Sequence, residues 1–186
     1  MVETAEPDQR LRELYDEHRA ALHAYCRRRL EASVVPDAVS DIFLTVWRRI
    51  DDVPADAELP WMYGVARNVI SNHLRSGRRR LRLASAVGSQ PSTEVPGADV
   101  PVVRRAEERL LLQALSTLSP ADQELLRLRA WEELSSAEIG VALDISASAV
   151  DMRLTRAKRR LQKALRSAGY FESVSSPRIV RNGGSS

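Results

Sequence analysis

The stretch 135–165 constrains this chain most, because its pattern predicts two helices joined by a short turn. Ser135 or Ser136 is placed to cap the first helix, since a serine oxygen there accepts a hydrogen bond from a free backbone N–H. The apolar contacts of that short helix are expected from Ile139, Val141 and Leu143. Residues 144–146 interrupt the pattern, so the turn is predicted there.

The second predicted helix is long and basic, and Ser146 or Ser148 can cap it. Its apolar residues recur at steps of three and four and form one stripe: Val150, Leu154, Ala157, Leu161 and Leu165. At about 100° per residue, another set falls away from that stripe: Ser148, Met152, Thr155, Arg156 and Arg159. A short helix, a turn and a helix with a cationic outer face are typical of a helix-turn-helix, whose second helix enters a DNA major groove.

A simpler interpretation of the same stretch is a helical hairpin with a solvated basic face, because amphipathic helices are common. The cations, however, crowd the helix expected to face DNA, where arginine meets phosphates and guanine edges. We therefore favour DNA binding.

The positive charge of the chain is unevenly distributed. The 186 residues carry a formal net charge of only +3, with a pI near 9.4. One cluster of cations comprises Arg75, Arg78, Arg79, Arg80 and Arg82. A second comprises Arg153, Arg156, Lys158, Arg159, Arg160, Lys163 and Arg166. Two separated basic patches indicate two contact regions on a polyanion, and the length allows one ordinary domain or two small ones.

Several classes of protein are disfavoured by what the sequence lacks. A single cysteine, Cys26, excludes an internal disulfide, and we find neither a signal peptide nor an apolar run of membrane-spanning length. We therefore expect a cytoplasmic protein without membrane insertion. His18, His23 and Cys26 fall on one predicted helix, but further ligands are lacking, so packing is favoured over a metal site. Without a nucleophile–base pair, phosphate loop or carboxylate dyad, we expect neither catalysis nor a cofactor.

Helical periodicity organises the N-terminal half, where strand signals are nearly absent. Helices are predicted over 9–30 and 33–50, with residues 1–8 frayed and Pro36 in the first turn of the second helix. Residues 51–60 hold four acids and two prolines, which predicts a loop. A third helix is predicted over 61–76, with Gly77 at its end.

Composition then divides the chain. Residues 83–101 are rich in glycine, proline and small polar residues, which is typical of a flexible linker. A helix is predicted over 102–118, and Ser119 and Pro120 begin another as cap and first helical residue. We therefore predict an all-α chain with two small helical domains, 9–82 and 102–168, joined by the linker and followed by a tail, 169–186. Disorder is the favoured interpretation of the tail, with a regulatory segment as the alternative.

Four segments, in this order, resemble regions of the extracytoplasmic-function sigma factors, group IV of the sigma-70 family of RNA polymerase subunits. The start of region 2 resembles LRELYDEHRAALHAYCRRRL, and region 2.2 resembles PDAVSDIFLTVWRRI. The end of region 2.3 with region 2.4 resembles WMYGVARNVISNHLRSGRRR. Region 4 resembles LSPADQELLRLRAWEELSSAEIGVALDISASAVDMRLTRAKRRL. The likeness covers about residues 10–168.

The resemblance implies a promoter-specificity subunit that binds core RNA polymerase, recognises the −35 and −10 promoter elements and helps to melt DNA. Its implied partners are promoter DNA, the clamp helices of the largest polymerase subunit, the flap of the second-largest subunit, and an anti-sigma factor. The expected polymerase-binding residues are Asp37, Asp41, Leu44 and Arg48. Phe43 and Trp47 support that surface or belong to it, but their helical spacing favours the core.

The resemblance also assigns residues to each promoter element. The acidic loop at 51–60 corresponds to the segment that captures a flipped base, whose unstacking costs a few kcal/mol. The −10 residues are expected to be Asn68, Asn72, His73, Arg75, Arg78 and Arg79. The −35 residues are expected to be Arg129, Ser148, Asp151, Met152, Thr155, Arg156 and Arg159. For the arginines that follow Asn72, a solvated helix end is the simpler alternative.

The chain departs from the family pattern at three places. Val34 and Ser40 replace an acid and a glutamine that are usual in region 2.2. Asp151 stands where a basic residue is common; its carboxylate repels phosphate but accepts a hydrogen bond from cytosine N4. The tail also runs past the usual end of region 4.

Two other functions compete with this interpretation. A stand-alone helix-turn-helix regulator would bind duplex DNA unaided, but it has no need of Asp37, Asp41, the acidic loop and Asn68. A nucleic-acid-processing enzyme is disfavoured because no catalytic constellation is evident.

Overall fold

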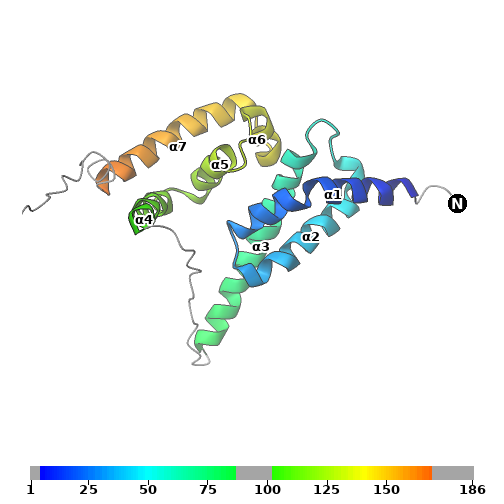
Figure 1. Cartoon of the computed structure of the whole chain (residues 1–186), viewed down its shortest axis with the longest axis horizontal. Helices are drawn as coiled ribbons and strands as arrows, with labels where there is room; N and C mark the ends of the chain where they lie inside the picture. Colours follow the sequence, from blue (N-terminus) through cyan, green and yellow to red (C-terminus); the bar gives the residue numbers. More distant parts are fainter. Residues whose placement is uncertain (1–4, 87–101, 169–186) are drawn as a thin grey trace, which may run out of the picture. The chain divides into compact units, whose positions relative to one another are not determined.

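A computed structural model describes residues 5–86 and 102–168, which are helical throughout apart from turns (Figure 1). In these two stretches there is no strand, which confirms the all-α prediction. The α-helices are α1 (Ala5–Arg27), α2 (Val35–Arg48), α3 (Glu58–Ala86), α4 (Val102–Ser116), α5 (Pro120–Ala130), α6 (Ser136–Leu143) and α7 (Ala147–Ser167). Two 3₁₀ turns, Ala32–Val34 and Ile50–Asp52, flank α2. The predicted linker from 87 and the tail from 169 lie outside the described residues, as do the side chains of 80–108.

Contacts divide the described residues into two units. The first unit contains residues 5–86 and 128–150, and the second contains 102–127 and 151–168. The division falls within α5 and within α7. The domain boundaries predicted at 82 and 102 stay predictions.

The core of the first unit lies where α1, α2 and α3 pack against one another. Its large, fully buried side chains include Leu22, Tyr25, Ile42, Val46 and Met62. The rings of Tyr25 and Tyr63 lie 4.9 Å apart, which joins α1 to α3. Burying side chains of this size stabilises a domain by about 1.5–3 kcal/mol each, so this three-helix core holds the first unit together.

The two aromatic residues predicted for the core of α2 differ in the structure. Phe43 is buried, as expected, but the prediction for Trp47 is wrong because 48% of its surface is exposed. The buried stripe of α2 passes through Val39, Ile42 and Val46. Trp47 lies one residue beyond this stripe, about 100° around the helix from Val46. It therefore belongs to the surface.

Several predicted helix boundaries are wrong. Helix α1 begins at Ala5 rather than after a frayed stretch to residue 8. The predicted loop 51–60 contains a 3₁₀ turn and ends at Glu58, so Pro60 lies in the first turn of α3, where its missing N–H costs little. Gly77 does not end α3, which continues to Ala86. Arg75, Arg78 and Arg79 therefore lie inside a continuous helix, and a helix-end dipole does not account for them.

The buried thiol of α1 is a packing group, as the sequence predicts. Cys26 is fully buried, and burial raises its pKa to about 11, with the Arg29 guanidinium acting in the opposite direction. A thiol with such a pKa stays protonated and unreactive at neutral pH.

The second unit has an apolar core of its own. Ala114, Leu115 and Leu118 are buried at the end of α4 and just after it, and Leu125 and Leu126 are buried on α5. Its part of α7 contributes the buried residues Leu154 and Ala157, which confirms most of the predicted stripe, while Leu161 and Leu165 are half-buried. The Ser119 hydroxyl accepts a hydrogen bond from the Asp122 N–H at 3.2 Å, so the predicted cap of α5 is confirmed.

Among the described residues, we find no helix both long and apolar enough to cross a lipid bilayer.

Candidate nucleic-acid and polymerase interface

The first helix of the predicted helix-turn-helix is fixed at its start by a reciprocal cap. The Ser135 hydroxyl accepts a hydrogen bond from the Glu138 N–H at 3.2 Å, and the Glu138 carboxylate accepts one from the Ser135 N–H at 2.7 Å. These bonds satisfy two N–H groups that a helix start leaves without partners. The Ser135 side chain, followed by its backbone N–H, holds the pKa of Glu138 below its ordinary value.

Replacing Ser135 by alanine removes one half of this cap and is expected to lower the free energy of unfolding by about 1 kcal/mol at neutral pH. Because the folded-state pKa of Glu138 is lowered, the stabilisation by its carboxylate is complete above the ordinary pKa of 4.5 and is lost as the pH falls through the lowered value. Denaturant unfolding of both proteins at about pH 7 and about pH 3 measures this. A difference that stays constant over this range contradicts the role of Glu138.

The turn after α6 depends on close backbone approach. Asp144 adopts a left-handed conformation (φ 54°), and the Ser146 hydroxyl accepts a hydrogen bond from the Ala149 N–H at 3.2 Å to cap α7. A Cβ atom on Gly140 would lie 2.7 Å from the Ile145 carbonyl oxygen, so only glycine fits there. Ile139 is buried, but the predicted apolar contact of Val141 is wrong: 39% of its surface is exposed.

The predicted −35 residues of α7 lie on its exposed side. Met152 is 57% exposed, and the remaining members of this set on α7 are also exposed: Ser148, Asp151, Thr155, Arg156 and Arg159. The Thr155 hydroxyl donates a hydrogen bond to the Asp151 carbonyl at 2.9 Å. Arg129, on α5, donates through Nη1 to the Leu134 carbonyl at 2.8 Å, so it supports the loop before α6. The structure thus brings six of the seven residues onto one helix.

The predicted −10 residues all come from α3. Asn68 and Asn72 are exposed one turn apart, and the Asn72 side-chain oxygen accepts a hydrogen bond from Arg75 at 2.5 Å. Arg78 and Arg79 are exposed further along the helix. An amide offers both a donor and an acceptor to a base edge, and arginine binds phosphates. One side of α3 therefore carries groups suited to base edges, followed by groups suited to the backbone.

His73 joins this surface to the predicted polymerase surface. Its Nε2 atom lies 2.8 Å from the Asp41 carboxylate of α2. A groove of about 350 Å³ between the two helices is lined by Asp41, Leu44, Thr45, Arg48, Val69, Asn72, His73 and Ser76. Three of the four predicted polymerase-binding residues thus share a groove with two predicted −10 residues. Asp37 is exposed on α2, outside this lining.

Trp47 is a surface residue that the sequence pattern did not predict. Together with Leu44, which is 42% exposed, it places a large apolar area on the outside of α2. Scattered apolar residues are normal on surfaces, but Leu44 and Trp47 are three residues apart and so lie on one side of the helix, and contiguous exposed apolar area with an aromatic ring is typical of protein interfaces. The signal that could have predicted its exposure is its position one residue after Val46, outside the apolar stripe of α2.

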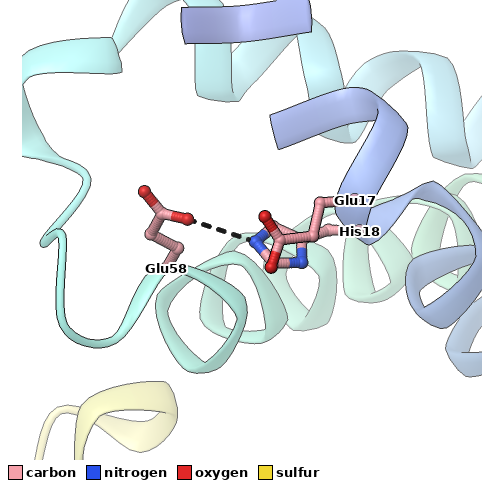
Figure 2. Close-up of side chains that lie close together, drawn as sticks. All are labelled: Glu17, His18 and Glu58. Carbon is pink, nitrogen blue, oxygen red and sulfur yellow. Dashed lines mark hydrogen bonds and ion pairs between the residues drawn. The ribbon is translucent and has the colours of Figure 1, made fainter. Parts of the chain in front are cut away.

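A second group of polar residues involves His18, for which the sequence suggested only His23 and Cys26 as neighbours. Glu17, His18 and Glu58 bring donor atoms within 4.8 Å of one another, and His18 Nε2 lies 3.3 Å from Glu58 (Figure 2). Arg10 lies 4.0 Å from the other Glu58 oxygen and donates to the Val53 carbonyl at 2.7 Å. Because this guanidinium already supplies positive charge, we interpret the group as a tether between α1 and the start of α3.

Comparison with known proteins identifies two regions of this chain. Family models described as Sigma-70 region 2 and Sigma-70, region 4 match residues 14–80 and 108–161. The ECF RNA polymerase sigma factor SigL of Mycobacterium tuberculosis is 33% identical over 86% of this chain and 90% of its own length. The RNA polymerase sigma factor NccH of Alcaligenes xylosoxydans is 31% identical over 73% of this chain and 75% of its own.

Solved structures show the same fold. CnrH, solved in complex with the cytosolic domain of CnrY, matches with a TM-score of 0.57 and 22% identity over 84% of this chain and 88% of that one. RpoE of Bartonella quintana, solved with the anti-sigma factor NepR, matches with a TM-score of 0.56 and 19% identity over 86% and 96%. With both family models in the predicted order and a relative aligned over nearly its whole length, this chain belongs to the extracytoplasmic-function sigma factors of the sigma-70 family.

Proposed function

We propose that this sigma factor directs core RNA polymerase to promoters whose −35 element is read by α7 and whose −10 element is read by α3. The observation that carries this proposal is the groove in which Asp41, Leu44 and Arg48 of α2 meet Asn72 and His73 of α3. A stand-alone regulator would need only the helix-turn-helix. A surface that combines a predicted docking face with a predicted strand-reading face favours a factor that works on polymerase.

In the −35 contact, Arg156 is the principal reader, because its exposed guanidinium can make two hydrogen bonds to one guanine. Met152 offers an apolar contact to a thymine methyl group, and Arg159 neutralises phosphate. Asp151 accepts a hydrogen bond from cytosine and gives this factor a −35 preference that differs from those of relatives with a basic residue there. Ser148 and Thr155 complete the groove-facing side, and Arg129 contacts the DNA backbone.

In the −10 contact, Asn68 reads the edge of a base flipped from the non-template strand. Asn72, His73 and Arg75 follow it on α3, and Arg78 and Arg79 bind phosphates of the displaced strand. The loop before α3 forms the rest of the pocket through its backbone, because its acidic side chains repel a polyanion.

Polymerase docks through α2. Asp37, Asp41, Leu44 and Arg48 contact the clamp helices of the largest subunit, and the flap of the second-largest subunit contacts the C-terminal helical domain. Charged groups around an exposed leucine and Trp47 match the polar rim and apolar centre of a protein interface. An anti-sigma factor is a further expected partner, supported by the complexes in which RpoE and CnrH were solved. We place the protein in the cytoplasm as a non-enzymatic subunit.

The predicted role of Arg156 is tested by its replacement with alanine. Loss of a two-bonded guanine contact is expected to cost about 1–3 kcal/mol of −35 binding and to relax specificity at one base pair. Lys158→Ala removes a charge of the same sign from another face of α7, and its effect is expected to be smaller and independent of sequence. Transcription from promoters randomised in the −35 element measures both. Equal losses on all sequences would show that Arg156 contacts only phosphate.

The proposed function itself is tested by transcription in vitro with core RNA polymerase on a promoter library. We expect a set of promoters that depends on this protein, with common −35 and −10 sequences. If no promoter becomes dependent on it, while the protein alone footprints duplex DNA, it is a stand-alone regulator instead.

A further inference from the structure

The loop between α2 and α3, residues 49–57, is held to α1 by one arginine. Arg10 Nη2 donates a hydrogen bond to the Val53 carbonyl at 2.7 Å, across 43 residues of sequence. Val53 is 4% exposed and has an extended backbone (φ −73°, ψ 113°), as expected for a residue that precedes a proline. Because Pro54 restricts this backbone, the Val53 carbonyl has a fixed direction, and the guanidinium of Arg10 binds it there.

The same guanidinium also reaches the first residue of α3. Arg10 Nη2 lies 4.0 Å from Glu58 Oε1, and the other oxygen of Glu58 lies 3.3 Å from His18 Nε2 (Figure 2). The His18 side chain is only 9% exposed, so this ring has a fixed place in α1. Two residues of α1, about two turns apart, therefore hold the loop and the start of α3 together.

The hydrogen bonds within the loop are short-range and long for their kind. The Val53 N–H donates to the Ile50 carbonyl at 3.3 Å, and the Ala57 N–H donates to the Pro54 carbonyl at 3.2 Å. Four acids also repel one another across this short segment. They are Asp51, Asp52, Asp56 and Glu58. A cation bound at the middle of the loop offsets part of this repulsion and joins the loop to a separate helix.

We propose that Arg10 is a positioning residue for −10 recognition, because it holds the loop 49–57 in the conformation that accepts the flipped base. This inference rests on the proposed function, in which that loop and Asn68 form two sides of the base pocket. The Arg10 contacts fix one side relative to the other, since Val53 belongs to the loop and Glu58 belongs to the helix that carries Asn68. Arg10 thus acts through the backbone of the loop rather than through a contact with DNA.

The expected effect follows from how a pocket discriminates between bases. A base is accepted when its edge meets donors and acceptors in fixed places, so discrimination falls when one side of the pocket moves. General affinity for the strand comes from phosphate contacts, which are proposed for Arg78 and Arg79 further along α3. Loss of the Arg10 contact is therefore expected to lower discrimination among bases in the −10 element and to leave −35 selection unchanged.

Hydrogen exchange in the free protein measures the contact itself. Arg10→Met keeps an unbranched side chain and removes every donor, whereas Arg10→Lys keeps one charged donor group. In Arg10→Met we expect the Val53 and Ala57 amides to exchange about tenfold faster, because a charge-assisted hydrogen bond no longer restrains the loop. Arg10→Lys should restore part of this protection. The matched control, Arg12→Met, removes the same charge from an exposed position of α1 and should leave both amides unchanged.

Transcription with core RNA polymerase measures the consequence, on promoters that carry each of the four bases at the position of the flipped base. The ratio of transcription from the preferred base to that from the others is expected to fall about tenfold in Arg10→Met. It should recover in part in Arg10→Lys and stay unchanged in Arg12→Met. Selection among −35 sequences should be the same in all of these proteins. A residue with only a structural role would lower transcription equally on every promoter, so the ratio separates positioning from stability.

Each of three results overturns the proposal. Unchanged exchange in Arg10→Met would show that Arg10 does not hold the loop. Faster exchange with an unchanged ratio would show that the position of the loop does not determine base discrimination. An equal loss on all four bases, with unchanged exchange, would assign Arg10 to a phosphate contact. If the wild type supports no transcription at all, the proposed function fails and the role in −10 recognition fails with it, while the exchange result still decides whether Arg10 holds the loop.

Discussion

Replacing Ile42 by alanine is expected to lower the free energy of unfolding of the first unit by about 2–5 kcal/mol. Ile42 is fully buried where α2 packs against α1 and α3, so the shorter side chain leaves a cavity as well as losing apolar burial. Denaturant unfolding followed by circular dichroism measures the change as a lower midpoint with an unchanged slope. A cost below about 1 kcal/mol would mean that the site collapses around the smaller residue.

Leu44→Ala is the matched comparison, because it removes a similar side chain from the same helix. Leu44 is 42% exposed and lines the groove, so its replacement is expected to change stability by no more than about 0.5 kcal/mol. Its affinity for core polymerase, measured by titration of a fluorescently labelled protein, should nevertheless fall. Unchanged affinity would remove Leu44 from the docking face.

Gly140→Ala is expected to destabilise the helix-turn-helix by about 1–3 kcal/mol and to weaken −35 binding further. The added methyl group would lie 2.7 Å from the Ile145 carbonyl, and a backbone atom cannot rotate aside as a side chain can. The turn must therefore open, which changes the angle between α6 and α7. Hydrogen exchange of the α6 amides and binding to −35 duplex DNA measure the two effects.

Gly77→Ala is the control for this substitution. The same methyl group meets nothing within 4 Å, so the better helix propensity of alanine should stabilise α3 by about 0.5–1 kcal/mol. If Gly140→Ala were equally harmless, the turn would not depend on close backbone approach.

Local patterns predicted the elements that local physics determines. The step of three and four along Val150, Leu154 and Ala157 defined the buried side of α7, and serines before both helices of the motif defined their starts. The wrong predictions arose where a local signal was overruled. Glycine often ends a helix, yet α3 continues through Gly77 because the residues on both sides of it favour helix.

The partners of the charged residues could not be predicted from the sequence, because each partner is distant along the chain. Glu58 lies 40 residues from His18, and Glu132 lies more than a hundred from Arg28 and Arg29. The local sequence around Glu132 and Glu133 does not distinguish the buried carboxylate of Glu132 from the exposed one of Glu133. The groove that joins Asp41 to His73 likewise depends on packing between helices, and neither helix alone predicts it.

The length of α3 has a mechanical consequence. Its 29 residues span about 43 Å, and between Pro60 and Arg75 it contains neither a further proline nor an adjacent glycine–serine pair, which are the usual sites of a sharp kink. The α3 side of the groove, Asn68 and Arg75 all lie on this one helix, so their orientations relative to one another are fixed. In the proposed function, a partner bound at the groove therefore sets the position and angle at which Asn68 and Arg75 meet the nucleic acid. A substitution of one of these side chains leaves this alignment unchanged, because the alignment is determined by the backbone of the helix.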